Sequence, residues 1–146
     1  LYGYKSSKLI VKDIELKPVM TFKSNIYKIK RLQKGDSVSY GRRFVAESET
    51  TVAVVPAGYG DGIFWNLTGI GKCLINGKPY NIVGAVCMDQ VIVDVLDDDV
   101  NIGDEVVFIG RSGDYFLGAD KIAEQLRTIP YEVTTSITAR VPRIVI

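Results

Sequence analysis

Histidine is absent from this chain of 146 residues, so the usual source of acid–base chemistry near neutral pH is missing. Any proton transfer that the chain performs must use tyrosine, a carboxylate, lysine or a thiol, or borrow a partner from elsewhere. Only two cysteines occur, Cys73 and Cys87, which are too few for a disulfide framework. Both lie in apolar contexts, and we expect buried free thiols in a reducing compartment rather than a bridge.

The sequence also lacks a membrane segment and an excess of one charge. No apolar run approaches the roughly 20 residues needed to span a bilayer, and no signal peptide opens the chain. The net charge is +1, which argues against a nucleic-acid binder. The only basic cluster, KIKRLQK at 28–34, is typical of a solvated strand end. We therefore expect no nucleic-acid partner and no membrane contact by this domain itself.

The composition is that of an ordinary globular protein, with 47% hydrophobic and 24% charged residues. This length suits one domain that buries a core of its own, and we expect one domain over residues 1–146. The chain begins with LYGYKSS and not with methionine. We interpret it as a fragment of a longer protein.

Strand patterns dominate the sequence. TTVAVVPAGY (50–59) is a β-branched run that ends at proline and glycine. CLINGKPYNIVGAV (73–86) places Asn76-Gly77 between two apolar stretches, the strongest short signal for a β-hairpin. VIVDVL (91–96) alternates and then runs into three aspartates. These aspartates lack the spacing and glycine of a calcium loop, so they favour a solvated turn and we expect no metal site.

One helix is expected, at ADKIAEQLRT (119–128), where apolar residues recur at helical spacing. Asp120 in its first turn and Arg127 in its last suit the helix dipole, and Pro130 is expected to end it. Many short strands followed by one late helix predict a mainly β protein. We expect a β-barrel or sandwich with a small helical appendage.

Tyr40 has two interpretations. KGDSVSYGR (34–42) resembles IGDEVVFIGR (102–111) elsewhere in the chain. Strand alternation puts Tyr40 on the same face as Val38, at a position that Phe108 fills in the second copy. On this pattern Tyr40 is a core residue that faces inward. The alternative is a proton carrier at the end of a strand.

The residues after Tyr40 bear on the second interpretation. Gly41 would clear space beside the phenol, and Arg42 and Arg43 would add positive charge. Alternation sends the two arginines to opposite faces, so at most one points toward a site. The favoured interpretation for each arginine is a solvated surface residue.

Two other segments gather polar groups and glycines. GYGDG (58–62) has neither the spacing of a Walker A loop nor that of a dinucleotide fingerprint, and it favours a backbone bend at a strand end. GAVCMDQ (84–90) holds a cysteine, but no histidine is available to act as its base. From composition alone the function stays open. A non-catalytic β-barrel binding module, with tyrosines as core or ligand platform, is one alternative.

Six motifs occur in the order and spacing that bacterial alanine racemases have: SVSYGRRF (37–44), VPAGYGDG (55–62), VGAVCMDQ (83–90), GDEVVFIG (103–110), IPYEVTTSI (129–137) and ARVPRI (139–144). The chain thus resembles the C-terminal β-domain of that family over nearly its whole length. The resemblance does not include the family's N-terminal barrel, because the initial LYG matches the residues at which that barrel ends.

The resemblance implies a two-domain enzyme that depends on pyridoxal 5′-phosphate (PLP). In the family an N-terminal (β/α)₈ barrel carries the lysine that bonds PLP, so this chain alone is expected to be inactive. Family members are head-to-tail homodimers, in which the C-terminal domain of one subunit helps to complete the other subunit's active site. The implied reaction is the interconversion of L- and D-alanine for peptidoglycan precursors, in the cytoplasm.

The family uses two bases on opposite faces of the substrate Cα. One is the barrel lysine, and the other is the tyrosine of the SYG motif, which corresponds to Tyr40. A phenol with a pKa of about 10 is a poor base at pH 7 unless positive charge stabilises its anion. The family supplies that charge largely from the partner's barrel, which agrees with the lack of histidine here.

Four further positions carry over from the resemblance. Met88 matches the methionine whose backbone N–H helps to hold the substrate carboxylate, and Asp89 follows it near the catalytic tyrosine. Tyr59 matches the tyrosine of the family's GYADG motif, close to the substrate in the partner's site. Tyr131 matches an inner-gate tyrosine that contacts the PLP phosphate, where a hydroxyl donates to an anion without adding a full charge.

The sequence departs from the commoner pattern in three places. GYGDG stands where most relatives read GYADG, and Trp65 and Ala85 stand where some relatives carry arginines of the entry corridor. A serine/alanine racemase of the vancomycin-resistance type (VanT), with a membrane-embedded N-terminal region, therefore stays an alternative. Such a protein would work at the cytoplasmic face of the membrane. Tyr131 favours alanine, because a bulky phenol leaves less room for a substrate hydroxyl.

Overall fold

The computed structural model describes residue 3 and residues 16–145. Leu1 and Tyr2 of the LYG motif, which was expected to match the end of the barrel, lie outside the described residues. In the part of the chain that is described, no helix is long and apolar enough to cross a membrane.

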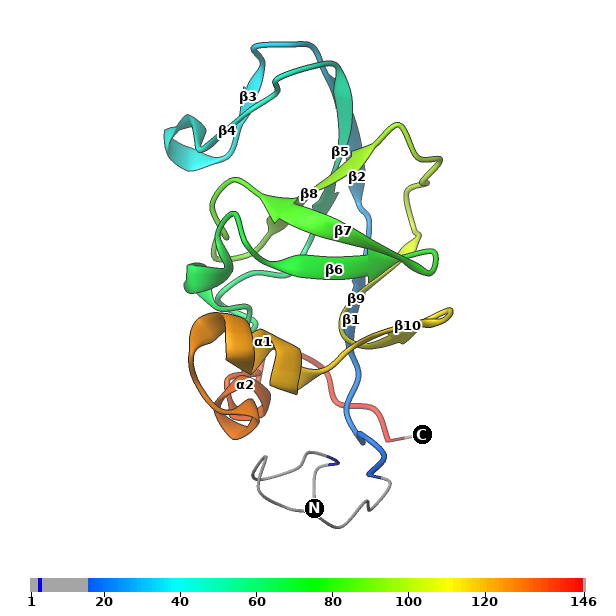
Figure 1. The fold of residues 1–146 in the computed structure, drawn as a ribbon, viewed down its shortest axis with the longest axis vertical. Coiled ribbons are helices and arrows are strands. Elements are labelled where there is room, and N and C mark those ends of the chain that lie inside the picture. The colour runs from blue at the N-terminus through cyan, green and yellow to red at the C-terminus, as the bar shows by residue number, and fades with distance from the viewer. Residues whose placement is uncertain (1–2, 4–15, 146) are drawn as a thin grey trace.

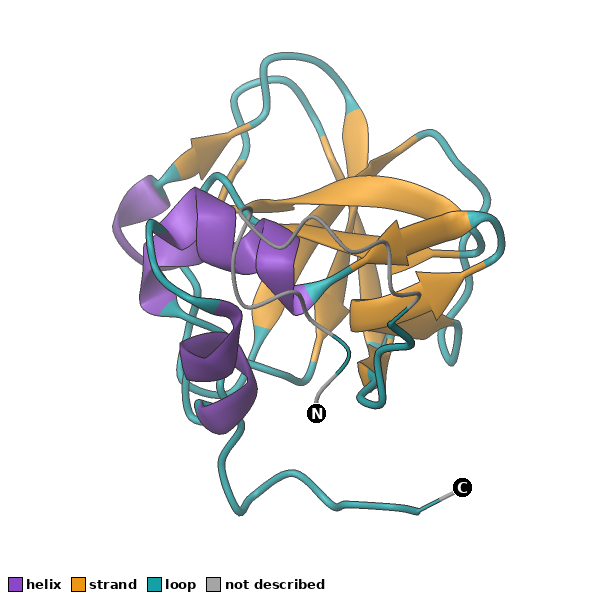
Figure 2. Ribbon diagram, turned by 60° about the horizontal axis from the view of Figure 1, so that its bottom comes forward, coloured by secondary structure: helices purple, strands orange, loops and turns teal. Residues whose placement is uncertain are grey.

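Strands make up most of the described secondary structure (Figure 2), which confirms the prediction of a mainly β protein. The elements in chain order are β1 (Phe22–Asn25), β2 (Lys28–Leu32), β3 (Ser37–Val38), the 3₁₀ helix η1 (Tyr40–Arg42), β4 (Phe44–Val45), β5 (Thr50–Val55), the 3₁₀ helix η2 (Trp65–Leu67), β6 (Lys72–Ile75), β7 (Lys78–Val83), β8 (Val91–Leu96), β9 (Glu105–Ser112), β10 (Tyr115–Leu117), α1 (Ala119–Leu126) and α2 (Pro130–Thr135).

Eight strands form one antiparallel sheet in the order β1-β9-β6-β7-β8-β5-β2, with β10 beside β9. β1 and β2 lie at opposite ends of this order, although only Ile26 and Tyr27 separate them in the chain. Two intervening residues bridge about 11 Å at most. The two edges must therefore approach each other, and the sheet curls toward a barrel (Figure 1).

Aliphatic side chains fill the curled sheet. In β8, Val91, Val93 and Val95 are completely buried, and Val106 of β9 joins them in the main core. Each such side chain contributes about 1.5–3 kcal/mol on burial. Cys73 belongs to the same core, and burial raises the pKa of its thiol. Both cysteines are buried and free, as predicted. Because aliphatic side chains fill the interior, we look for polar functional groups in the loops at the strand ends.

The predicted hairpin is confirmed. Asn76 and Gly77 link β6 to β7 with φ angles of 48° and 74°, and both central residues of a type I′ turn need such positive values. The aspartates after β8 form a turn in which Asp98 accepts hydrogen bonds from the Tyr80 hydroxyl at 2.6 Å and the Lys78 ammonium at 3.1 Å. These two donors lower the pKa of the Asp98 carboxyl.

The helical end of the chain differs in part from its prediction. α1 confirms the helix expected near residues 119–128, but it ends at Leu126, and Arg127 after it has a left-handed φ of 56°. Pro130 was expected only to stop that helix, and it is instead the first residue of a second helix, α2. Proline suits this position because the first N–H of a helix has no intrahelical acceptor. The two helices pack together beside the curled sheet (Figures 1 and 2).

Candidate active site

Tyr40 lies at the tip of a small arm, formed by β3 and β4, that projects from the curled sheet (Figure 1). Its side chain is 80% exposed, so the prediction that it faces inward beside Val38 is wrong. Alternation requires extended backbone, and Ser39 breaks it with a φ of 70°. The matching residue in β9, Phe108, sits in an unbroken strand and is buried.

Ser39 fastens this tip to the loop between β7 and β8. The Ser39 hydroxyl accepts a hydrogen bond from the Ala85 N–H at 2.8 Å and donates to the Ala85 carbonyl at 3.2 Å. Gly84 leaves the necessary space, because a Cβ there would lie 2.5 Å from the Cβ of Ser39. The serine of the SYG motif thus holds Tyr40 close to the segment that contains Met88.

The GYGDG segment (58–62) pairs with the same loop through its backbone. The Tyr59 N–H donates to the Cys87 carbonyl and the Gly60 N–H donates to the Met88 carbonyl, each at 2.9 Å. A Cβ at Gly58 would lie 2.2 Å from the Cys87 carbonyl oxygen, so the close approach needs glycine. The prediction of a backbone bend at a strand end is confirmed, since the segment follows β5.

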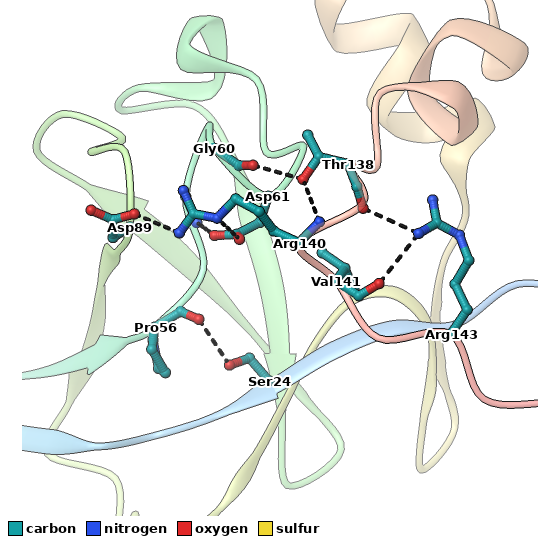
Figure 3. A network of polar contacts seen from close by, with 10 residues as sticks. Ser24, Pro56, Gly60, Asp61, Asp89, Thr138, Arg140, Val141 and Arg143 are labelled. Atoms are coloured by element: carbon teal, nitrogen blue, oxygen red, sulfur yellow. Dashed lines mark hydrogen bonds and ion pairs between the residues drawn. The ribbon is translucent and has the colours of Figure 1, made fainter.

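Arg140 joins the aspartates of the two loops (Figure 3). Its Nη2 donates to Asp89 Oδ1 at 2.6 Å, and its Nε lies 3.3 Å from Asp61 Oδ1. The hydrogen bond to Asp89 and the charge of Asp61 raise the pKa of the Arg140 guanidinium. Gly60 makes room for this contact, because a Cβ there would lie 2.3 Å from Arg140 Nη1. Glycine in place of the alanine of GYADG therefore leaves the space that the Arg140 guanidinium occupies.

Arg140 received no role from the sequence, although it lies in the ARVPRI motif. Asp61, Asp89 and Arg140 come from three different motifs, and Asp89 and Arg140 are 51 positions apart. Nothing in their local patterns indicates that they meet. The only available signal was that charged residues occur in each of three motifs: one aspartate in VPAGYGDG, one in VGAVCMDQ and two arginines in ARVPRI.

One open pocket of about 650 Å³ brings together Tyr40, Tyr59, Met88 and Asp89. Its other lining residues are Arg43, Trp65, Ala85, Val86, Cys87 and Gln90. Within the described residues, neither the hydroxyl of Tyr40 nor the backbone N–H of Met88 has a hydrogen-bond partner. The pocket therefore offers a phenol and a main-chain donor to a bound molecule.

Tyr131 does not line this pocket. It lies in the first turn of α2, and its backbone carbonyl accepts a hydrogen bond from the Thr135 hydroxyl at 2.8 Å. The end of α2 is tied to the GYGDG segment, since Ser136 Oγ donates to the Gly62 carbonyl at 3.0 Å. The structure thus brings four of the five predicted site residues together and leaves the fifth on a separate element.

The two arginines after Tyr40 point to different surroundings. Arg42 Nε donates to Ser37 Oγ at 3.0 Å, outside the pocket. Arg43 lies over the Trp65 ring, with its Cζ 5.2 Å from the ring centre, and lines the pocket. At most one arginine was expected to point toward the site, and this is confirmed. Both arginines are exposed, as favoured, although Arg43 also lines the pocket.

Comparison with known proteins connects this geometry to one family. Residues 19–145 match the family described as "Alanine racemase, C-terminal domain". The chain belongs to the alanine racemase family. Alanine racemase 1 of Clostridium acetobutylicum and the alanine racemase of Clostridium novyi are each 45% identical to it over the whole chain. The chain spans 38% of the length of each of these two alanine racemases.

Solved alanine racemases have the same fold over this part of the chain. The enzyme of Bacillus anthracis, solved with bound L-Ala-P, is 39% identical with a TM-score of 0.92, covering 98% of this chain and 37% of that one. The enzyme of E. faecalis is 37% identical with a TM-score of 0.91, covering 97% and 38%. The expected fold, a mainly β domain of the alanine racemase C-terminal type, is confirmed.

Proposed function

We propose that the full-length protein is a PLP-dependent alanine racemase and that residues 1–146 form its C-terminal domain. The main support for this proposal is the pocket that Tyr40 and Met88 line. Among the described residues, neither the Tyr40 hydroxyl nor the Met88 backbone N–H has a hydrogen-bond partner. A core tyrosine would be buried, whereas Tyr40 is 80% exposed. That exposure argues against the alternative in which the tyrosines merely fill a binding module.

Racemisation of alanine requires that the Cα proton leaves from one face of the substrate and returns on the other. PLP, when bound, supplies the electron-withdrawing group that makes this proton acidic. Tyr40 serves as the base on one face, and the lysine of the barrel serves on the other. No described residue donates a hydrogen bond to the Tyr40 oxygen, and we expect the partner's barrel to supply the groups that stabilise its anion.

The remaining pocket residues bind and orient the substrate. The Met88 N–H donates to the substrate carboxylate, and a hydrogen bond of this kind to an ionised acceptor is about twice as strong as a neutral one. Tyr59 lies on the loop that pairs with Met88, so its ring flanks the same substrate. Asp89, held by Arg140, keeps the Met88 loop in position.

PLP is held mainly by the barrel. No lysine is among the described residues that line the pocket, so these residues do not offer the amine that PLP needs. Tyr131 fits one contact to the cofactor, because its hydroxyl can donate to the phosphate. Its full-size side chain favours alanine over serine as the substrate, in contrast to the VanT-type alternative.

The protein acts as a homodimer in the cytoplasm. Tyr40 and Tyr131 do not share a pocket in one chain, although both are expected to contact one reaction centre. A head-to-tail dimer resolves this separation, since Tyr40 then completes the partner's active site while Tyr131 serves the site of its own subunit. The exposed tip that carries Tyr40 is suited to reach into another subunit.

The test compares the full-length protein with residues 1–146 alone, each assayed with PLP for conversion of L-alanine to D-alanine. We expect the full-length protein to racemise alanine. The domain alone is expected to be inactive and to lose PLP absorbance on dialysis. L-serine serves as the second substrate, and a preference for serine supports the VanT-type alternative. A full-length protein that racemises neither amino acid contradicts the proposal.

A further inference from the structure

The pocket holds one cation that the proposed chemistry leaves without a role. Of the described residues that line it, only Arg43 and Asp89 carry a charge. The Asp89 carboxylate is paired with Arg140 at 2.6 Å, and the same guanidinium lies 3.3 Å from Asp61. Arg43 has no carboxylate partner within the described residues. Among the described residues that line the pocket, Arg43 is therefore the one cation, and its charge is not paired with a carboxylate.

Trp65 positions the Arg43 guanidinium without occupying its hydrogen-bond donors. The Arg43 guanidinium lies over the Trp65 ring with 5.2 Å between Cζ and the ring centre. An arginine stacked on an aromatic face is attracted by the π electrons, while the N–H groups at its rim remain free to donate. Both side chains are exposed on their outer sides, so an anion can approach the guanidinium from solvent.

We propose that Arg43 attracts the α-carboxylate of the amino acid substrate into the pocket and selects substrates whose carboxylate is free. This inference rests on the proposed racemase function and identifies a specificity-determining residue for it. Arg43 lines the same pocket as Met88, whose N–H binds the carboxylate once the substrate is seated. The attraction acts through solvent on a partly exposed charge, so salt screens it.

The test measures kcat and KM for L-alanine with the full-length enzyme from low to high ionic strength. For Arg43→Gln we expect KM to rise about 3- to 10-fold at low salt, because one attractive charge is lost, with kcat changed less than about twofold. The difference should shrink toward 1 M salt, where the screening length is about 3 Å. Arg43→Lys keeps the charge and should keep most of the salt dependence.

Arg42→Gln is the matched control, since it removes the same charge one position away. Arg42 is bound to Ser37 outside the pocket, so its KM and salt dependence should equal those of the wild type. An Arg43→Gln enzyme with wild-type KM at every ionic strength overturns the inference. So does a KM rise of equal size in Arg42→Gln or one that persists unchanged in high salt. A wild-type enzyme without racemase activity contradicts the proposed function instead.

Discussion

Replacing Tyr40 by phenylalanine in the full-length protein should lower the rate of alanine racemisation by roughly a hundred- to ten-thousand-fold, the usual contribution of a positioned acid–base group. The change removes one oxygen from a side chain that is 80% exposed and has no hydrogen-bond partner among the described residues. The domain should therefore fold as before. Initial rates in both directions, together with the thermal unfolding midpoint, measure the effect.

Two controls distinguish lost chemistry from lost structure. Tyr115→Phe removes the hydroxyl of another exposed tyrosine, on β10 and outside the pocket, and should leave the rate unchanged. In the Tyr40→Phe enzyme, the base on the opposite face should still exchange the α-proton of one alanine enantiomer with deuterated solvent without inverting it. Racemisation from L to D at the wild-type rate would show that Tyr40 is not the base.

Arg140→Gln is expected to lower kcat/KM about 10- to 100-fold, because small displacements of positioning groups are costly in an active site. The guanidinium holds Asp61 and Asp89, and thus the two loops that carry Tyr59 and Met88. The Asp61 side chain is only 14% exposed, so loss of its cation should also cost about 1–3 kcal/mol of stability. Steady-state kinetics and thermal unfolding give the two quantities.

A double-mutant cycle tests whether Arg140 acts through Asp89. Asp89→Asn should lower kcat/KM in the wild-type background and have little further effect on top of Arg140→Gln, since the two side chains share one contact at 2.6 Å. Arg111→Gln, which removes a surface arginine stacked on Phe116, should leave kcat/KM unchanged. Fully additive losses at Asp89 and Arg140 would contradict a positioning role.

Local features of the fold were predicted from the sequence where the residues of one short segment are enough to set its backbone conformation. Asn76 and Gly77 predicted their hairpin because both tolerate positive φ. The stripe of apolar residues at 119–128 predicted α1. Pro130 was ambiguous, because the same fixed φ that ends one helix suits the start of the next. The sequence does not say which applies, and α2 was therefore missed.

The site was harder to read, because it depends on contacts between distant segments. The inward orientation expected for Tyr40 assumed extended backbone, whereas Ser39 has a positive φ and is hydrogen-bonded to Ala85, 46 positions away. Arg140 contacts two aspartates that lie far from it in the sequence and on two different loops. The motifs predicted which residues matter, and the tertiary structure determined which of them meet.

Tyr40 is proposed to complete an active site in the other subunit of the dimer. Two inactive variants of the full-length protein test it most directly: Tyr40→Phe, and a variant in which the PLP-binding lysine of the barrel is replaced by alanine. In a hybrid dimer with shared sites, one site has an intact lysine and an intact tyrosine. Hybrids make up about half of a random mixture of subunits, so co-expression should restore roughly a quarter of the wild-type activity. If Tyr40 instead serves its own subunit, every site lacks one base, and the mixture stays as inactive as either variant alone.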